Sequence, residues 1–137
     1  MVVDASVVLR WFVDQPGHVE AAAWLKRFAS NAELLVAPDL LRFAVSGALS
    51  RLQERGDATW AQRSFERFDR LGMRELPTTT GLHLRAIELS RELRVSGYDA
   101  IHLAHAESLG LRWLTADERA LRRLAGDKRV LPLIKNH

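Results

Sequence analysis

Residues 2–9 read Val-Val-Asp-Ala-Ser-Val-Val-Leu, a short apolar run that ends in an acid and continues into a second apolar stretch. The run at residues 2–4 suits a buried strand, and residues 5–13 suit a helix that follows it directly. Asp4 is therefore expected at the carboxyl end of the first strand. This opening predicts an α/β protein.

The rest of the chain repeats this alternation of strand and helix. Helices are expected at residues 18–29, 79–93, 99–109 and 117–124, and two more lie between Pro38 and a stop at Gly56 and between an N-cap at Asp57 and a stop at Gly72. Further strands are expected at residues 34–37, 73–76, 112–115 and 130–133. Strands separated by helices imply a parallel sheet in one domain over residues 1–137. Ligands of such sheets bind at the carboxyl ends of the strands.

Composition narrows the class of protein. The 137 residues include no cysteine, which excludes disulfides and thiolate metal sites. No stretch approaches the roughly 18 apolar residues of a membrane span, and the start has no signal-peptide pattern. We therefore expect a cytoplasmic protein without a membrane partner. The net charge of +3 permits a polyanionic partner without requiring one.

Three acids stand at junctions between expected elements. Asp4 ends the first strand, Asp117 follows the strand at residues 112–115, and Asp99 begins a helix after Gly97. Each one alone has an ordinary explanation as a helix cap. Together they could meet at one edge of the sheet, where clustered carboxylates repel each other unless a cation neutralises them. An all-oxygen site favours Mg²⁺ or Mn²⁺.

Polar residues near these acids have both a functional and a structural interpretation. Ser6 and Thr115 could support the site with hydroxyl oxygens, or could form local turns and caps. The arginines nearest the same edge, which could hold phosphates, are Arg10, Arg42 and Arg119. His102 and His105 share one helix three residues apart, and we expect them to be structural because no third ligand accompanies them.

Three segments in this order resemble a known family. Residues 2–9, Gly97-Tyr98-Asp99-Ala100-Ile101-His102-Leu103-Ala104 and Leu114-Thr115-Ala116-Asp117 are similar to motifs of PIN-domain toxins of the VapC family. The resemblance implies a three-layer fold with a five-stranded parallel sheet flanked by helices. It implies Mg²⁺-dependent cleavage of RNA, often tRNA or rRNA, by Asp4, Asp99 and Asp117. It also implies a cognate VapB-type antitoxin and a toxin homodimer.

One position departs from the family pattern. The segment at residues 37–49 matches the family's second motif, but Ala44 stands where that motif has a metal-site glutamate. From the pattern alone, Ala44 is a core residue in the apolar stripe of its helix. Losing one of four carboxylates should weaken or inactivate the enzyme. Either the natural protein is a degenerate member or a glutamate has been replaced, and the intact flanks of the other three acids favour replacement.

Two other functions fit parts of the sequence. A non-catalytic module would bind the antitoxin or RNA, and an apolar groove for a partner helix could be formed by Trp11, Phe12, Trp60, Phe65 and Phe68. We expect most of these aromatic residues to belong to the core instead. A response-regulator phosphoacceptor domain would need paired acids after the first strand, whereas Asp4 is followed by Ala5 and Ser6. The ribonuclease interpretation explains more of the chain than either of these.

Overall fold

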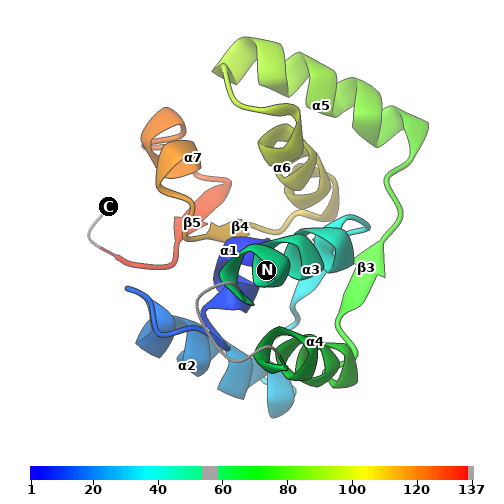
Figure 1. Ribbon diagram of the computed structural model, residues 1–137. Helices are drawn as coiled ribbons and strands as arrows, with labels where there is room; N and C mark the ends of the chain where they lie inside the picture. The colour runs from blue at the N-terminus through cyan, green and yellow to red at the C-terminus, as the bar shows by residue number, and fades with distance from the viewer. Residues whose placement is uncertain (54–58, 136–137) are drawn as a thin grey trace.

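Five strands form one parallel sheet in the computed structural model, which describes residues 1–53 and 59–135 (Figure 1). The strands are β1 (Val2–Val3), β2 (Val36–Pro38), β3 (Arg74–Leu76), β4 (Trp113–Thr115) and β5 (Val130–Pro132). Their order across the sheet is β3-β2-β1-β4-β5. The first strand therefore lies in the centre, and Asp4 leaves the sheet between the ends of β2 and β4.

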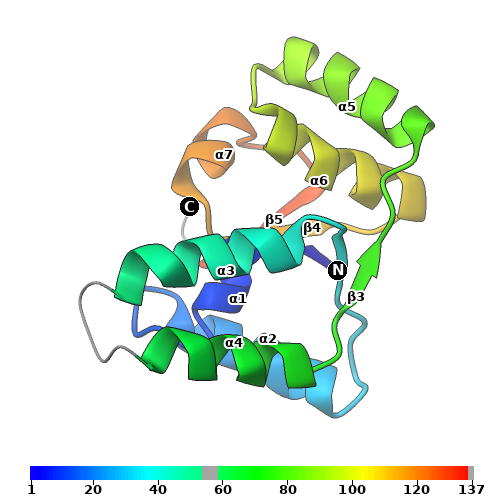
Figure 2. The same ribbon diagram turned by 45° about the vertical axis from the view of Figure 1, so that its right-hand side comes forward.

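The helices of the described residues flank this sheet. They are α1 (Ala5–Leu9), α2 (His18–Ala29), α3 (Leu41–Leu52), α4 (Trp60–Arg70), α5 (Thr80–Leu93), α6 (Gly97–Leu109) and α7 (Glu118–Arg123). Figures 1 and 2 show α5, α6 and α7 on one side of the sheet and α1 to α4 on the other. The predicted α/β architecture with three layers is confirmed.

Alternation along the strands explains why both faces are covered. Val2 and Trp113 belong to the core beneath α5, α6 and α7, whereas their neighbours Val3 and Leu114 belong to the core beneath α1 to α4. All four of these side chains are fully buried. Because successive strand residues point to opposite faces, two-sided burial requires the continuous apolar runs that the sequence contains.

Two predicted helix starts were wrong. Pro38 does not open α3 but ends β2, where it pairs with Leu76, and the helix begins at Leu41. Gly97 does not break the chain but is the first residue of α6, because the Ser96 side chain caps that helix by accepting a hydrogen bond from the backbone N–H of Asp99.

Other boundaries differ less. The helix expected at residues 5–13 ends at Leu9 and continues as a turn. The expected stop at Gly56 and cap at Asp57 lie outside the described residues. Within residues 1–53 and 59–135, no helix is long and apolar enough to cross a membrane.

Candidate functional site

The three acids predicted from the sequence line one open pocket of about 440 Å³ at the carboxyl edge of the sheet. Asp4 comes from the end of β1, Asp99 from the first turn of α6, and Asp117 from the turn between β4 and α7. The other side chains around the pocket include those of Ser6, Phe43, Ala44, Tyr98 and His102. The central position of β1 brings together residues that are more than 90 positions apart.

Asp4 is held by four hydrogen bonds. Its Oδ1 atom accepts from the backbone N–H of Ser6 at 2.9 Å and from the Ser6 hydroxyl. Its Oδ2 atom accepts from Trp113 Nε1 at 3.2 Å and from the Thr115 hydroxyl at 2.5 Å. A carboxylate offers about four acceptor positions, so protein donors saturate this one. The carboxylate is therefore fixed in orientation, and Asp4 is only 9% exposed.

The two hydroxyls also join the strand ends to each other. Ser6 Oγ accepts from the backbone N–H of Ala116 at 2.9 Å, and Thr115 Oγ1 accepts from that of Asp117 at 3.1 Å. The hydroxyl oxygens lie 3.3 Å apart, although each already has Asp4 as an acceptor. Ser6 and Thr115 thus position the turns after β1 and β4, as the structural interpretation of these two hydroxyls expects.

Asp117 combines the two interpretations that its position allowed. Its Oδ1 atom caps α7 by accepting from the backbone N–H groups of Arg119 at 3.0 Å and Ala120 at 3.2 Å. In the described part of the chain, no hydrogen bond involves its Oδ2 atom. A helix cap therefore leaves one oxygen of this carboxylate for the pocket.

The pKa of the Asp99 carboxyl is shifted by its surroundings in the pocket. Burial raises the pKa of its carboxyl above the ordinary value, and the negative charges of Asp117 and Asp4 raise that pKa further. A hydrogen bond with Ser96 and the nearby His102 oppose these effects. Burial is the larger cause of the raised pKa of Asp99, and the contributions of Asp117 and Asp4 are those of carboxylates that repel one another when ionised.

The donor chemistry of this pocket fits a hard divalent cation, but the arrangement is short of ligands. Within residues 1–53 and 59–135, no three acidic or histidine side chains already form a metal-holding group. Ala44, where the resemblance in sequence implies a glutamate, lines the same pocket and is half-buried. Its methyl group supplies no oxygen. The site therefore offers carboxylates of the right kind and lacks a donor on α3.

The two histidines of α6 do not act as a pair. His102 Nδ1 bonds to the backbone carbonyl of Tyr98 at 2.7 Å, and the ring stacks on Trp113. His105 Nε2 lies 2.9 Å from the hydroxyl of Thr78, which also donates to Asp39 at 2.8 Å. Since the Thr78 proton goes to Asp39, His105 is the donor of its own contact. Sequence reasoning missed this network, because its members follow β2 and β3 and lie inside α6.

The predicted phosphate-binding arginines lie in three different environments. Arg10 donates to the backbone carbonyls of Pro16 at 2.7 Å and Ser6 at 2.8 Å, and Arg42 pairs with Asp69. Neither of them lines the carboxylate pocket. Arg119 lines an adjoining polar pocket that shares Asp117 with it.

Comparisons with known proteins agree with this architecture. A family model described as PIN domain matches residues 1–127. A toxin-antitoxin complex from Klebsiella pneumoniae is similar in structure, with a TM-score of 0.70, 18% identity, and coverage of 98% of both chains. PAE2754 from Pyrobaculum aerophilum gives a TM-score of 0.70 at 22% identity, over 96% of this chain and 89% of its own. At these identities the two structures establish likeness of fold. No curated protein matches the sequence.

Proposed function

The chain belongs to the PIN domain family, and from this premise we propose that it is the toxin of a toxin–antitoxin pair, built as a metal-dependent endoribonuclease. The observation that carries the proposal is the convergence of Asp4, Asp99 and Asp117 on one open pocket. We assign the site to a single domain over residues 1–137, with Ser6 and Thr115 in support.

The cofactor of this site would be Mg²⁺ or Mn²⁺, because its donors are carboxylate oxygens. Asp99 and Asp117 would hold the ion, and Asp4 would join them when the Ser6 hydroxyl turns its proton away and frees the Oδ1 atom. Such an ion, when bound, polarises a phosphoryl oxygen and activates water for in-line attack. The protein's own contribution is positioning, since Ser6, Thr115 and Trp113 fix the Asp4 carboxylate. Repulsion between Asp99 and the charges of Asp117 and Asp4 would favour a bound cation.

The proposed substrate is RNA, with tRNA or rRNA as the expected class, and the proposed location is the cytoplasm. A cognate antitoxin of the VapB type would cover the pocket, and the toxin would form a homodimer. The similar fold of a toxin-antitoxin complex supports the antitoxin partner. Arg119 would contact an RNA phosphate, and Arg10 and Arg42 stay secondary candidates because both already have protein acceptors.

A second function is favoured by one specific feature of the pocket. Ala44 leaves the site without a donor on α3, and the Asp4 carboxylate is saturated by protein donors. A non-catalytic PIN module that binds an antitoxin or RNA would have such a site. The aromatic residues considered for a partner groove pack instead against the core, so they do not form the groove that this alternative expected.

The experiment that separates the two functions restores the missing carboxylate. Ala44→Glu should raise Mg²⁺-dependent cleavage of cellular RNA by about 100-fold, the upper range for a residue that supports a metal site. Cleavage is measured by electrophoresis of total tRNA and rRNA after incubation with Mg²⁺, Mn²⁺ or EDTA. Ser50→Glu is the matched control, because it adds the same charge to an exposed position of α3 away from the pocket.

Three outcomes decide between the proposals. Cleavage by Ala44→Glu that is lost in the double variant Ala44→Glu/Asp99→Asn supports the nuclease. Equal cleavage by Ser50→Glu points to a contaminating enzyme and contradicts the assignment. If Ala44→Glu binds Mg²⁺ in calorimetry but leaves all RNA intact, the non-catalytic module is the better description.

A further inference from the structure

A second polar pocket of about 390 Å³ adjoins the carboxylate pocket. The two share the side chains of Tyr98, Asp99 and Asp117. The second pocket adds three arginines to this common wall, namely Arg94, Arg119 and Arg123. They come from the end of α5 and from α7, so the fold and not local sequence brings them together.

These three arginines differ from the paired arginines elsewhere on the surface. Arg85 and Arg129 both bind Glu107, with N–O distances of 2.8 Å, and Arg129 also binds Asp127. In the described part of the chain, by contrast, no ion pair or hydrogen bond engages the guanidinium groups of Arg94, Arg119 and Arg123. All three residues are exposed. Their donors are therefore available to an anion from outside.

The backbone places Arg94 in an unusual way. It ends α5 in the left-handed region, at φ 56° and ψ 42°, where glycine or asparagine is the usual residue. The next residue, Val95, is buried, and its carbonyl accepts from the Ser90 hydroxyl at 2.7 Å. This anchor fixes the short link between α5 and α6. An arginine is thus held at a position that favours a smaller residue, on the rim of the pocket.

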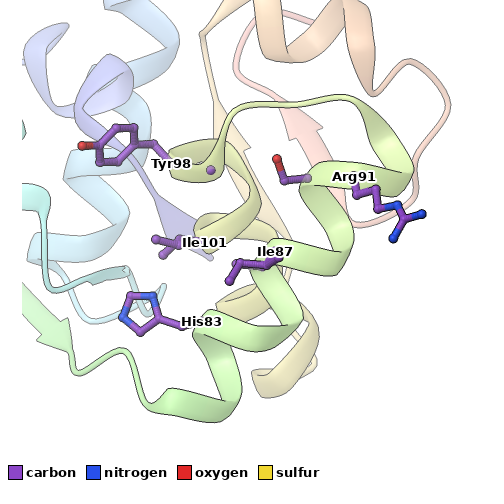
Figure 3. Close-up of a pocket in the computed structure, with 8 residues that line it drawn as sticks. His83, Ile87, Arg91, Tyr98 and Ile101 are labelled. Atoms are coloured by element: carbon purple, nitrogen blue, oxygen red, sulfur yellow. The ribbon is translucent and has the colours of Figure 1, made fainter.

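Tyr98 adds an aromatic surface at the boundary of three hollows. It is 72% exposed and lines the carboxylate pocket, the arginine pocket and a mostly apolar cleft between α5 and α6. In that cleft Ile87 and Ile101 lie opposite each other, and the Tyr98 ring points away from Arg91 (Figure 3). An exposed ring beside unpaired arginines is the pattern of single-stranded nucleic acid binding, in which bases stack and cations hold the backbone.

We propose that Arg94, Arg119 and Arg123 form a phosphate subsite for the RNA strand, and that Tyr98 stacks on a base between this subsite and the carboxylate pocket. The proposal rests on the proposed function, because the strand would enter the same site. Planar guanidinium groups bind phosphate oxygens in a bidentate manner, which suits a backbone phosphate. Because the two pockets share one wall, a phosphate in the subsite would lie next to the acids. The subsite would therefore determine which phosphodiester bond of the strand lies at the carboxylate pocket.

Binding of a fluorescently labelled single-stranded RNA of mixed sequence, followed by anisotropy in EDTA, tests the subsite without cleavage. Arg119→Gln and Arg123→Gln should each weaken binding about five- to tenfold near 0.1 M salt and lower the salt slope by about 1. Arg122→Gln is the matched control, because Arg122 is exposed on the same helix and does not line the pocket. It should stay within about twofold of the parent.

Two further variants separate binding from folding. Arg94→Gly should keep or raise the melting temperature, because glycine accepts positive φ, while it weakens RNA binding. Tyr98→Ala should weaken binding about tenfold and Tyr98→Phe should retain it, since stacking needs the ring and not the hydroxyl.

Several results would overturn the subsite. If Arg122→Gln weakens RNA binding as much as Arg123→Gln does, the binding depends on overall positive charge and not on this pocket. Competition by polyglutamate as strong as by unlabelled RNA at equal charge would assign the pocket to acidic chains. The proposed nuclease can fail separately from the subsite. If Ala44→Glu binds RNA as the parent does but does not cleave it, the nuclease assignment is wrong and the phosphate subsite stands. If Ala44→Glu/Arg123→Gln has the same KM for RNA as Ala44→Glu, the phosphate subsite is wrong and the nuclease assignment stands.

Discussion

Asp4 and Asp99 line the same pocket, but their surroundings have opposite effects on the ionised carboxylate. At the end of β1, four donors surround Asp4 and use all of its acceptor positions. At the start of α6, burial and two neighbouring negative charges act against the ionised form of Asp99. The first region stabilises the charge of Asp4 with hydrogen bonds from the fold, whereas the charge of Asp99 would be stabilised by the cation that we propose. The same pocket thus contains one acid, Asp4, whose hydrogen bonds stabilise the fold, and another, Asp99, whose ionised form is disfavoured by its surroundings.

The largest expected effect is on the Asp4 side. Asp4→Ala should lower the free energy of unfolding by about 3 kcal/mol, because it leaves buried donors of Trp113 and Thr115 without an acceptor. Urea denaturation followed by tryptophan fluorescence measures the change. Asp99→Ala serves as the comparison and should stay within about 0.5 kcal/mol of the parent. Equal losses in the two variants would abolish the distinction between the two regions.

A smaller effect should come from one of the donors to Asp4. Thr115→Val keeps the shape of the side chain and removes its hydroxyl, which donates to Asp4 and accepts from the backbone N–H of Asp117. We expect a loss of about 1 to 2 kcal/mol in the free energy of unfolding. The same urea series measures it. A neutral result would mean that water replaces this hydroxyl and that Asp4 is less firmly held than its four hydrogen bonds indicate.

The smallest effect should have the opposite sign and depend on pH. Because the folded-state pKa of Asp99 is raised, its ionisation lowers stability as pH rises from the usual carboxyl pKa through the raised one. Asp99→Asn removes that penalty, so without metal its melting temperature should exceed the parent's by about 2 °C at neutral pH. The two proteins should converge at pH values below the usual carboxyl pKa. Thermal scans across this range in EDTA provide the measurement.

Added metal should reverse that order. A ligand that binds only the folded state raises its stability according to concentration and affinity. Mg²⁺ should therefore raise the melting temperature of the parent more than that of Asp99→Asn. An identical response of both proteins to Mg²⁺ would show that the cation binds elsewhere.

The positions of Asp4 and Asp117 could be predicted because the rule that governs them is local. Each follows an apolar run, and parallel strands present their carboxyl ends at one edge. The saturation of Asp4 could not be predicted, because it depends on the Trp113 ring and its register against β1. The same applies to the arginine pocket, since Arg94 meets Arg119 and Arg123 only through the packing of α5, α6 and α7.

Helix starts failed for a related reason. Pro38 suits a first helical turn, but it also suits a strand end whose N–H is not needed, and pairing with Leu76 decides for the strand. Arg10 has the charge of a phosphate ligand, yet two backbone carbonyls within its reach take its donors. In both cases a partner from elsewhere in the fold outweighs the preference of the residue itself.

The central place of β1 has a consequence for the order of events during synthesis. β1 leaves the ribosome before β2, β3 and β4, although β4 is one of its two neighbours in the sheet. Until residues 113–115 have emerged, Asp4 lacks two of its four donors, Trp113 and Thr115, and Asp117 is not yet part of the chain. A partly made chain therefore has no assembled pocket. Whatever chemistry this pocket performs can therefore begin only after residues 113–117 have been made.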